Sequence, residues 1–204
     1  LVRDDNMKPL YMIGCVNEIG KRQKADNVSG LLGESGFREY MNQLDTPLET
    51  GYLLRIGIDH FKEINDNFGQ EYGDFVLKKT AECISGCTSE GQKVYKLVAD
   101  EFLILDVASD EAKDADKLYD KVREAIDRFI ETNEFKVMYT VSGGIVPFAA
   151  LKGNQCSEAL KLTDFALNEA KKLGRNRCYI FNGETYRKIS SEKGDHPGTA
   201  GSCN

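Results

Sequence analysis

Hydrophobic residues recur along the chain with the two periods that distinguish strands from helices. An apolar row from Tyr52 to Ile58 alternates with a second row that ends in Gly57 and Asp59, so these two residues share the opposite face of a predicted strand. Spacings of three and four residues predict helices over 36–44, 61–67, 73–86, 110–132 and 156–173. Further apolar runs predict strands over 93–97, 102–107, 135–146 and 177–181.

This order of elements predicts one α/β domain of the α+β kind, with a central mixed β-sheet and helices packed over its faces. Residues 1–25 are too few to hold a core of their own, and we interpret them as a connector or the tail of an upstream domain. After Asn182 the chain becomes polar and rich in glycine, which predicts a flexible tail or linker over residues 183–204.

Composition and charge narrow the class of protein. The 204 residues are 41% hydrophobic and 29% charged, as in a soluble globular protein. The net charge of −6 and the isoelectric point of about 5.1 argue against binding to nucleic acid, while a few local cations suffice for a nucleotide. The chain has neither a signal-peptide layout nor the roughly 18 apolar residues that cross a bilayer. We therefore expect a cytoplasmic domain without a membrane segment, whose six cysteines are free thiols.

Five short segments carry the most specific information. They are Asp26–Leu31, Ile58–Asp66, Gly69–Asp74, Val98–Phe102 and Ala170–Asn176. In their order and spacing they resemble the GGDEF domain, the diguanylate cyclase module of bacterial signalling, which would span residues 26–182. The resemblance implies a palm-like sheet, similar to that of polymerases and nucleotidyl cyclases.

The resemblance also implies an activity and partners. In the family two copies face each other as a homodimer, and each holds one GTP. Two magnesium ions, or manganese in their place, help a 3′-hydroxyl attack the α-phosphate to make cyclic di-GMP. Lys8–Val16 resembles the last strand of a PAS sensor domain, so a PAS-like domain upstream and an EAL domain downstream are the expected neighbours.

The chain departs from the family at the metal site. Members of the family usually have the motif Asp-Ile-Asp at the end of their first strand, and the first Asp is a metal ligand. In this chain Gly57 stands at the position of that first Asp. Asp59 is the acid that remains on this face, but it lies about 6–7 Å further along the strand. Magnesium–oxygen distances are about 2.1 Å, so Asp59 is not a simple substitute as a metal ligand.

The acidic hairpin departs as well, because Val98 and Ala99 replace two glycines of the family. A left-handed conformation costs a residue with a Cβ about 1–2 kcal/mol, so we expect the turn to have changed shape. Asp100 and Glu101 remain as the candidate catalytic residues, and the family assigns Asp100 to metal binding as well. The alternative interpretation is that both are merely polar residues at a hairpin tip.

The residues implied in nucleotide binding are present. Asn65 and Asp74 match the pair with which the family reads guanine, and an amide and a carboxylate suit its polar edge. Their structural alternatives are a turn asparagine and a helix N-cap. Lys62, Lys171 and Arg175 match the cations that hold the phosphates, although Lys171 and Arg175 would also complement a helix dipole.

The product-inhibition motif Arg-x-x-Asp of the family is absent. Ser89 and Gln92 stand at its two positions, so we expect no feedback by cyclic di-GMP through that route. Lys96, where the family often has arginine, is interpreted as a strand residue that faces solvent.

Three hypotheses remain open. The first is a degenerate GGDEF domain without cyclase activity, which acts as a regulatory module in a larger signalling protein and binds GTP or a related nucleotide. The second is an active diguanylate cyclase that uses Asp59 and Asp100 to hold its metal ions. The third is a structural dimerisation module with an empty pocket.

Overall fold

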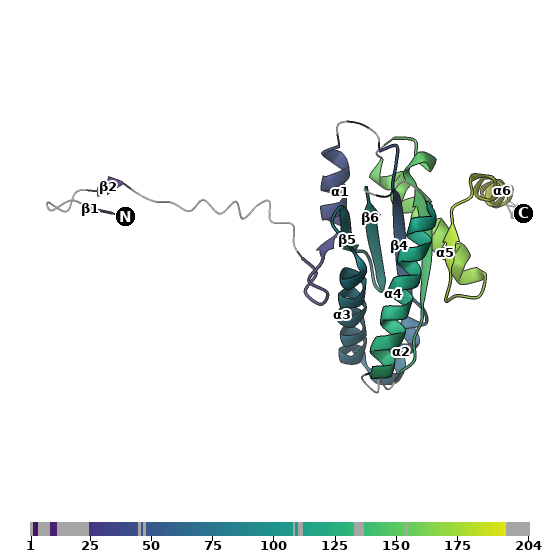
Figure 1. Ribbon diagram of the computed structural model, residues 1–204, viewed down its shortest axis with the longest axis horizontal. Helices are drawn as coiled ribbons and strands as arrows, with labels where there is room; N and C mark the ends of the chain where they lie inside the picture. Colours follow the sequence, from purple (N-terminus) through teal and green to yellow (C-terminus); the bar gives the residue numbers. More distant parts are fainter. Residues whose placement is uncertain are drawn as a thin grey trace, which may run out of the picture.

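A six-stranded mixed sheet forms the centre of the fold (Figure 1). The computed structural model describes residues 2–3, 9–11, 25–44, 46, 48–107, 109, 112–132, 137–153 and 155–194. The strand order is β3-β5-β6-β4-β7-β8. The pairs β3/β5 and β7/β8 are parallel and the other pairs are antiparallel, which confirms the predicted mixed sheet. The strands are β3 (Leu32–Gly33), β4 (Tyr52–Ile58), β5 (Gln92–Lys96), β6 (Glu101–Asp106), β7 (Val141–Pro147) and β8 (Cys178–Ile180).

The structure describes six α-helices, and the first five occur where the apolar spacing predicts them, with shifted ends. They are α1 (Glu34–Asn42), α2 (Phe61–Phe68), α3 (Gln70–Cys87), α4 (Ala112–Thr132), α5 (Cys156–Lys172) and α6 (Gly183–Gly194), with a 3₁₀ turn, η1 (Phe148–Ala150). The sequence predicted that α3 begins at Gly73, whereas it begins three residues earlier, at Gln70. Only Gly69, with φ of 85°, separates α2 from α3, so α3 begins directly after it.

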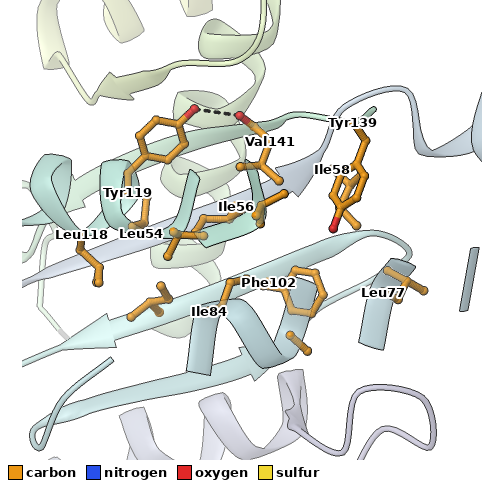
Figure 2. Close-up of a cluster of buried hydrophobic side chains, with 14 of the residues drawn as sticks. Leu54, Ile56, Ile58, Leu77, Ile84, Phe102, Leu118, Tyr119, Tyr139 and Val141 are labelled. Carbon is orange, nitrogen blue, oxygen red and sulfur yellow. Dashed lines mark hydrogen bonds between the residues drawn. The ribbon is translucent and has the colours of Figure 1, made fainter. Parts of the chain in front are cut away.

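The sheet is covered on both faces. On one face α2, α3 and α4 pack on the apolar row of β4, as Figure 2 shows for Leu54, Ile56 and Ile58. The hydroxyl of Tyr119 donates to the carbonyl of Val141 at 2.8 Å and so ties α4 to β7 (Figure 2). The opposite face packs on α1 and α5. Gly57 belongs to this opposite face, as the alternation predicts.

The structure corrects the flexible tail predicted from residue 183. Residues 183–194 form α6, which lies beside α5 (Figure 1). The Tyr186 ring lies edge to face on Phe165, with centroids 5.0 Å apart, and contacts Phe181 at 5.6 Å. A few aromatic contacts therefore hold a helix whose composition is mainly polar. Residues 195–204 lie outside the described part of the chain.

The N-terminal prediction stays a prediction. The described residues there form a two-stranded antiparallel pair, β1 (Val2–Arg3) and β2 (Pro9–Tyr11). Residues 12–24, which include much of the predicted connector, are outside the described part. Among the helices that the structure describes, none has the length and apolar character to cross a bilayer.

Candidate functional site

The hairpin of β5 and β6 brings its two acids to the end of β4. Glu101 lies directly opposite Gly57 in the antiparallel register. The backbone N–H of Ile58 donates to the carbonyl of Asp100 at 3.4 Å. The structure thus brings together the acids and the glycine that the sequence singled out.

The tip of the hairpin contains a left-handed residue although it has no glycine. Ala99 has φ of 54°, and the N–H of Glu101 donates to the carbonyl of Val98 at 3.2 Å to close the turn. A residue with a Cβ therefore adopts the left-handed conformation here, and the expectation that the turn has changed shape stays a prediction. Alanine, which is not branched at Cβ, takes the strained position, while Val98 avoids it and exposes 70% of its surface.

A buried lysine fastens the same turn. Lys96 is only 6% exposed, so the prediction that it faces solvent is wrong. Its Nζ donates to the carbonyl of Leu97 at 3.0 Å and to that of Ala99, and lies 5.2 Å from the centroid of the Phe102 ring. Burial lowers the pKa of Lys96, and the charge of Asp26 opposes this shift. The hydrogen bonds of Lys96 thus stabilise the turn that contains the left-handed Ala99.

Both carboxylate oxygens of Glu101 face cations. Oε2 accepts hydrogen bonds from Nε of Arg55 at 2.7 Å and from Nη2 of the same guanidinium, while Oε1 lies 3.8 Å from Nζ of Lys171. Arg55 is in turn anchored on α5, where its Nη1 donates to the carbonyl of Leu160 at 3.2 Å and its Nη2 lies 3.4 Å from Oδ1 of Asp164. The side chains of Arg55 and Glu101 are only 12% and 18% exposed, so this ion pair is shielded from solvent.

Lys171 also fills the space above Gly57. A Cβ at Gly57 would lie 3.1 Å from Nζ of Lys171 and 3.2 Å from Cδ2 of Leu167. An ammonium group thus occupies the region into which a side chain at position 57 would project.

Asp59 points away from the acidic hairpin. Its Oδ1 accepts from the hydroxyl of Ser142 at 2.7 Å, and its Oδ2 accepts from the hydroxyl of Thr140 at 2.7 Å and the N–H of Asn176 at 3.1 Å. Because β4 lies between β6 and β7, these bonds turn Asp59 toward β7, whereas Glu101 is on β6. Asp59 is 3% exposed and bonded to three donors.

These residues do not fit the magnesium or manganese site that the sequence resemblance implies. Gly57 offers no ligand, Glu101 is paired with Arg55, and Asp59 is bonded on the far side of β4. Within the described part of the chain, no three His, Cys, Asp or Glu side chains are grouped so as to hold a metal ion. Asp100 remains at the tip, where burial raises its pKa against the opposing charge of Lys171.

Asn65 on α2 lies against α3 at Gly73, the residue before Asp74, at the corner between the two helices. The buried Oδ1 of Asn65 has no hydrogen-bond partner among the described residues. It lies against Gly73, where an added Cβ would come within 1.8 Å of it, and Gly73 directly precedes Asp74. Both structural alternatives are wrong, because Asn65 is inside α2 and the N-cap of α3 is Gly69. The corner offers a buried acceptor beside a half-buried carboxylate.

The three predicted phosphate cations come from two regions. Lys62 is exposed on α2, Lys171 is in the last turn of α5, and Arg175 is exposed in the turn that follows. The N–H of Arg175 donates to the carbonyl of Ala170 at 3.2 Å and closes the end of α5. Lys171 and Arg175 also line a groove of about 710 Å³ that lies between α5 and α6, and whose lining includes neither Asn65 nor Asp74.

The two positions of the absent product-inhibition motif bond to each other. The N–H of Ser89 donates to Oε1 of Gln92 at 2.8 Å, and Nε2 of Gln92 donates to Oδ2 of Asp106 at 2.5 Å. Neither position carries an arginine that could hold a phosphate.

Arg55 is the functional residue that sequence reasoning missed. Its signal is its place in the alternation, because it lies between Leu53 and Gly57 on a face that should be buried. A charged side chain at a buried strand position requires a partner of opposite charge, and an acidic hairpin was already predicted nearby.

Comparison with known proteins identifies relatives along most of the chain. Residues 24–177 match the family model described as diguanylate cyclase, GGDEF domain. The chain is 28% identical over 172 residues to the cyclic di-GMP phosphodiesterase NbdA of Pseudomonas aeruginosa, covering 82% of this chain and 22% of that protein. It is 30% identical over 165 residues to the diguanylate cyclase DgcZ of Escherichia coli, covering 79% and 54%. The chain therefore spans about a fifth and about half of the length of these two relatives.

A solved structure confirms the predicted fold class. The GGDEF domain of TpbB, also called YfiN, from Pseudomonas aeruginosa superposes with a TM-score of 0.71 at 23% identity. The match covers 82% of this chain and 99% of that domain. The fold is the palm-like fold of nucleotidyl cyclases.

Proposed function

Because the chain belongs to the GGDEF domain family of cyclic di-GMP signalling proteins, we propose that it binds a guanine nucleotide as a regulatory module and does not catalyse cyclic di-GMP synthesis. GTP is the proposed ligand. The proposal treats two parts of the site separately. The acids that would bind metal ions are replaced or paired with cations, whereas Asn65 and Asp74, which would bind guanine, are present.

The pairing of Glu101 with Arg55 is the main support for the proposed loss of catalysis. A cyclase of this type needs carboxylates that are free to neutralise two metal ions beside a triphosphate. Here Gly57 provides none, and both oxygens of Glu101 already face cations of this chain. Asp100 is left without a second acid opposite it on β4.

The corner between α2 and α3 supports nucleotide binding. A buried amide oxygen without a partner is costly, and a ligand that donates a hydrogen bond would satisfy it. The guanine edge carries N–H donors that suit both the Asn65 oxygen and the Asp74 carboxylate. Lys62 and Arg175 are exposed cations that could receive the phosphates.

The relatives include both a protein named as a phosphodiesterase and one named as a diguanylate cyclase, so the proposed loss of synthesis rests on the site itself. In this proposal, binding of a nucleotide to this domain regulates an adjoining domain of the same protein. A PAS-like sensor upstream, an EAL domain downstream, a homodimeric arrangement and a cytoplasmic location belong to this proposal.

The cyclase reaction is tested directly. The chain is incubated at high concentration with GTP and either Mg²⁺ or Mn²⁺, and the products are separated by chromatography. We expect no cyclic di-GMP. Product that forms with the wild-type chain and disappears with Asp100→Ala would show instead an active cyclase.

Calorimetric titration tests the binding part. We expect heat on titration with GTP or GDP, and a marked loss of affinity in Asn65→Ala, with Asn67→Ala on the exposed side of α2 as the matched control. Absence of heat with GTP, GDP and cyclic di-GMP, unchanged by Asn65→Ala, would favour a dimerisation module with an empty pocket.

A further inference from the structure

We propose that Arg55 is an internal substitute for a divalent cation. Its guanidinium gives Glu101 the positive charge that a bound metal ion would give, and it keeps metal ions out of the site. This inference goes beyond the proposed function, because it concerns the protein without any nucleotide. It can therefore fail while nucleotide binding holds, and the reverse is also possible.

The guanidinium takes up the carboxylate oxygen that Glu101 would need to offer a metal ion. Gly57 is the cross-strand partner of Glu101, and Arg55 is two residues earlier on the same face of β4. The guanidinium of Arg55 therefore reaches Glu101 diagonally across the strands. Oε2 of Glu101 accepts hydrogen bonds from both Nε and Nη2 of Arg55. Nη1 is fixed on the carbonyl of Leu160, so α5 holds the group in place.

The charges of the site already balance. Three carboxylates, Glu101, Asp164 and Asp100, are matched by three cations, Arg55, Lys171 and Lys96, and the sum of these six formal charges is zero. Magnesium and manganese are bound by carboxylate, carbonyl and water oxygens, and here both oxygens of Glu101 already face cations of the protein. A divalent ion at Glu101 would also be repelled by two positive groups that lie within 4 Å of the carboxylate oxygens.

Burial makes this arrangement difficult to displace. The Arg55 and Glu101 side chains are 12% and 18% exposed, so salt screens their attraction less than at a surface pair. A guanidinium is also more weakly hydrated than an ammonium ion, which favours it in a site that is partly closed to water. Gly57 is part of the same arrangement, because it leaves room for the Lys171 side chain.

The experiment measures Mn²⁺ binding to the nucleotide-free chain by electron paramagnetic resonance, with isothermal calorimetry as a second readout. We compare the wild type, Gly57→Asp, and the double variant Arg55→Leu/Gly57→Asp. We expect no saturable site in the wild type at millimolar Mn²⁺. The double variant should bind at least about tenfold more tightly than Gly57→Asp, a ratio that corresponds to about 1.4 kcal/mol.

Arg38→Leu is the matched control, because it removes an exposed arginine from its ion pair with Glu34 on α1, at 2.6 Å. This variant should behave as the wild type. A wild-type Mn²⁺ site that disappears in Glu101→Gln overturns the proposal. A double variant that is folded by circular dichroism and gains no Mn²⁺ affinity over Gly57→Asp overturns it as well.

A measurement on the wild type keeps the test decisive if the double variant does not fold. The Arg55 Nε–H signal is observed by ¹⁵N magnetic resonance and assigned by its loss in Arg55→Lys. We expect it to remain sharp when Mn²⁺ is added. Paramagnetic broadening of this signal at millimolar Mn²⁺ would place the ion beside the guanidinium and refute the exclusion.

Discussion

Asp100 is held in the folded protein at some cost to stability. Burial raises its pKa, so the folded protein disfavours the ionised carboxylate relative to the unfolded chain. The penalty is present when the carboxylate is ionised in both states, and it vanishes below the ordinary pKa of 3.8, where both states hold the proton.

Asp100→Asn should therefore raise the melting temperature at pH 7, because the amide carries no charge to bury. The gain should shrink as the pH falls through the raised pKa and disappear below pH 3.8. Thermal unfolding followed by circular dichroism across this range measures it. A gain that is the same at every pH would mean that the charge of Asp100 is not its cause.

Ala99→Gly should raise the free energy of unfolding by about 0.5 kcal/mol. Glycine relieves the left-handed strain of φ 54°, although it also frees the unfolded chain. Urea denaturation gives the value. Val98→Gly is the matched control in the same turn, because Val98 does not have a positive φ, and this variant should not stabilise the protein.

Two side chains mark the limit of residue-by-residue prediction. Lys96 was expected at the surface because lysine is seldom buried, yet the strained turn offers it two carbonyls and the ring of Phe102. Arg55 is largely shielded from solvent because Glu101, on the neighbouring strand β6, pairs with its guanidinium. Both cases depend on partners that are distant in sequence or set by the turn, so a local pattern does not reveal them.

The pair of helices α2 and α3 depends on a close approach at Gly73. A Cβ there would lie 1.8 Å from Oδ1 of Asn65, whereas at Gly86, near the other end of α3, a Cβ would meet nothing within 4 Å. The two glycines are thus a matched pair within one helix.

Gly73→Ala should lower the free energy of unfolding by about 2 kcal/mol, because the corner must open to admit the methyl group. It should also weaken GTP binding if Asn65 reads guanine. Gly86→Ala should stabilise the protein by about 0.5 kcal/mol through better helix propensity. Urea denaturation compares the two, and equal effects would contradict the close approach.

The elements themselves were largely predictable. Apolar spacing located α1 to α5 and the strands from β4 to β8, since each element buries one regular stripe or row. Helix α6 was missed as a whole because its contacts are few, with Tyr186 on Phe165 and Phe181 among them, and the surrounding sequence is polar. Tyr186 was the available signal, as an aromatic residue in a segment interpreted as a tail.

Asp59 joins three parts of the molecule that are far apart in the sequence. From the end of β4 it reaches Thr140 and Ser142 near the start of β7 and the backbone of Asn176 before β8. The family resemblance identified Asp59 as an acid of interest, but its partners became visible only in the assembled sheet. The order of strands decides that it faces β7 rather than the acidic hairpin.

Asp59→Ala should lower the free energy of unfolding by about 3 kcal/mol or more, because three hydrogen bonds to a buried carboxylate are lost. Asp66→Ala, at an exposed position of α2, should change it by less than about 0.5 kcal/mol. Urea denaturation with and without Mg²⁺ measures both. If added Mg²⁺ stabilised the wild type and not Asp59→Ala, Asp59 would be a metal ligand after all.

The arrangement of Lys171 above Gly57 has an evolutionary consequence. An aspartate that arose at position 57 by mutation would lie against the ammonium group of Lys171, which would pair with the new carboxylate. Formation of a metal site would then require a second change at Arg55, which pairs with Glu101. Positions 55 and 57 therefore depend on each other, and under the proposed non-catalytic function neither change alone would give selection a metal site to act on.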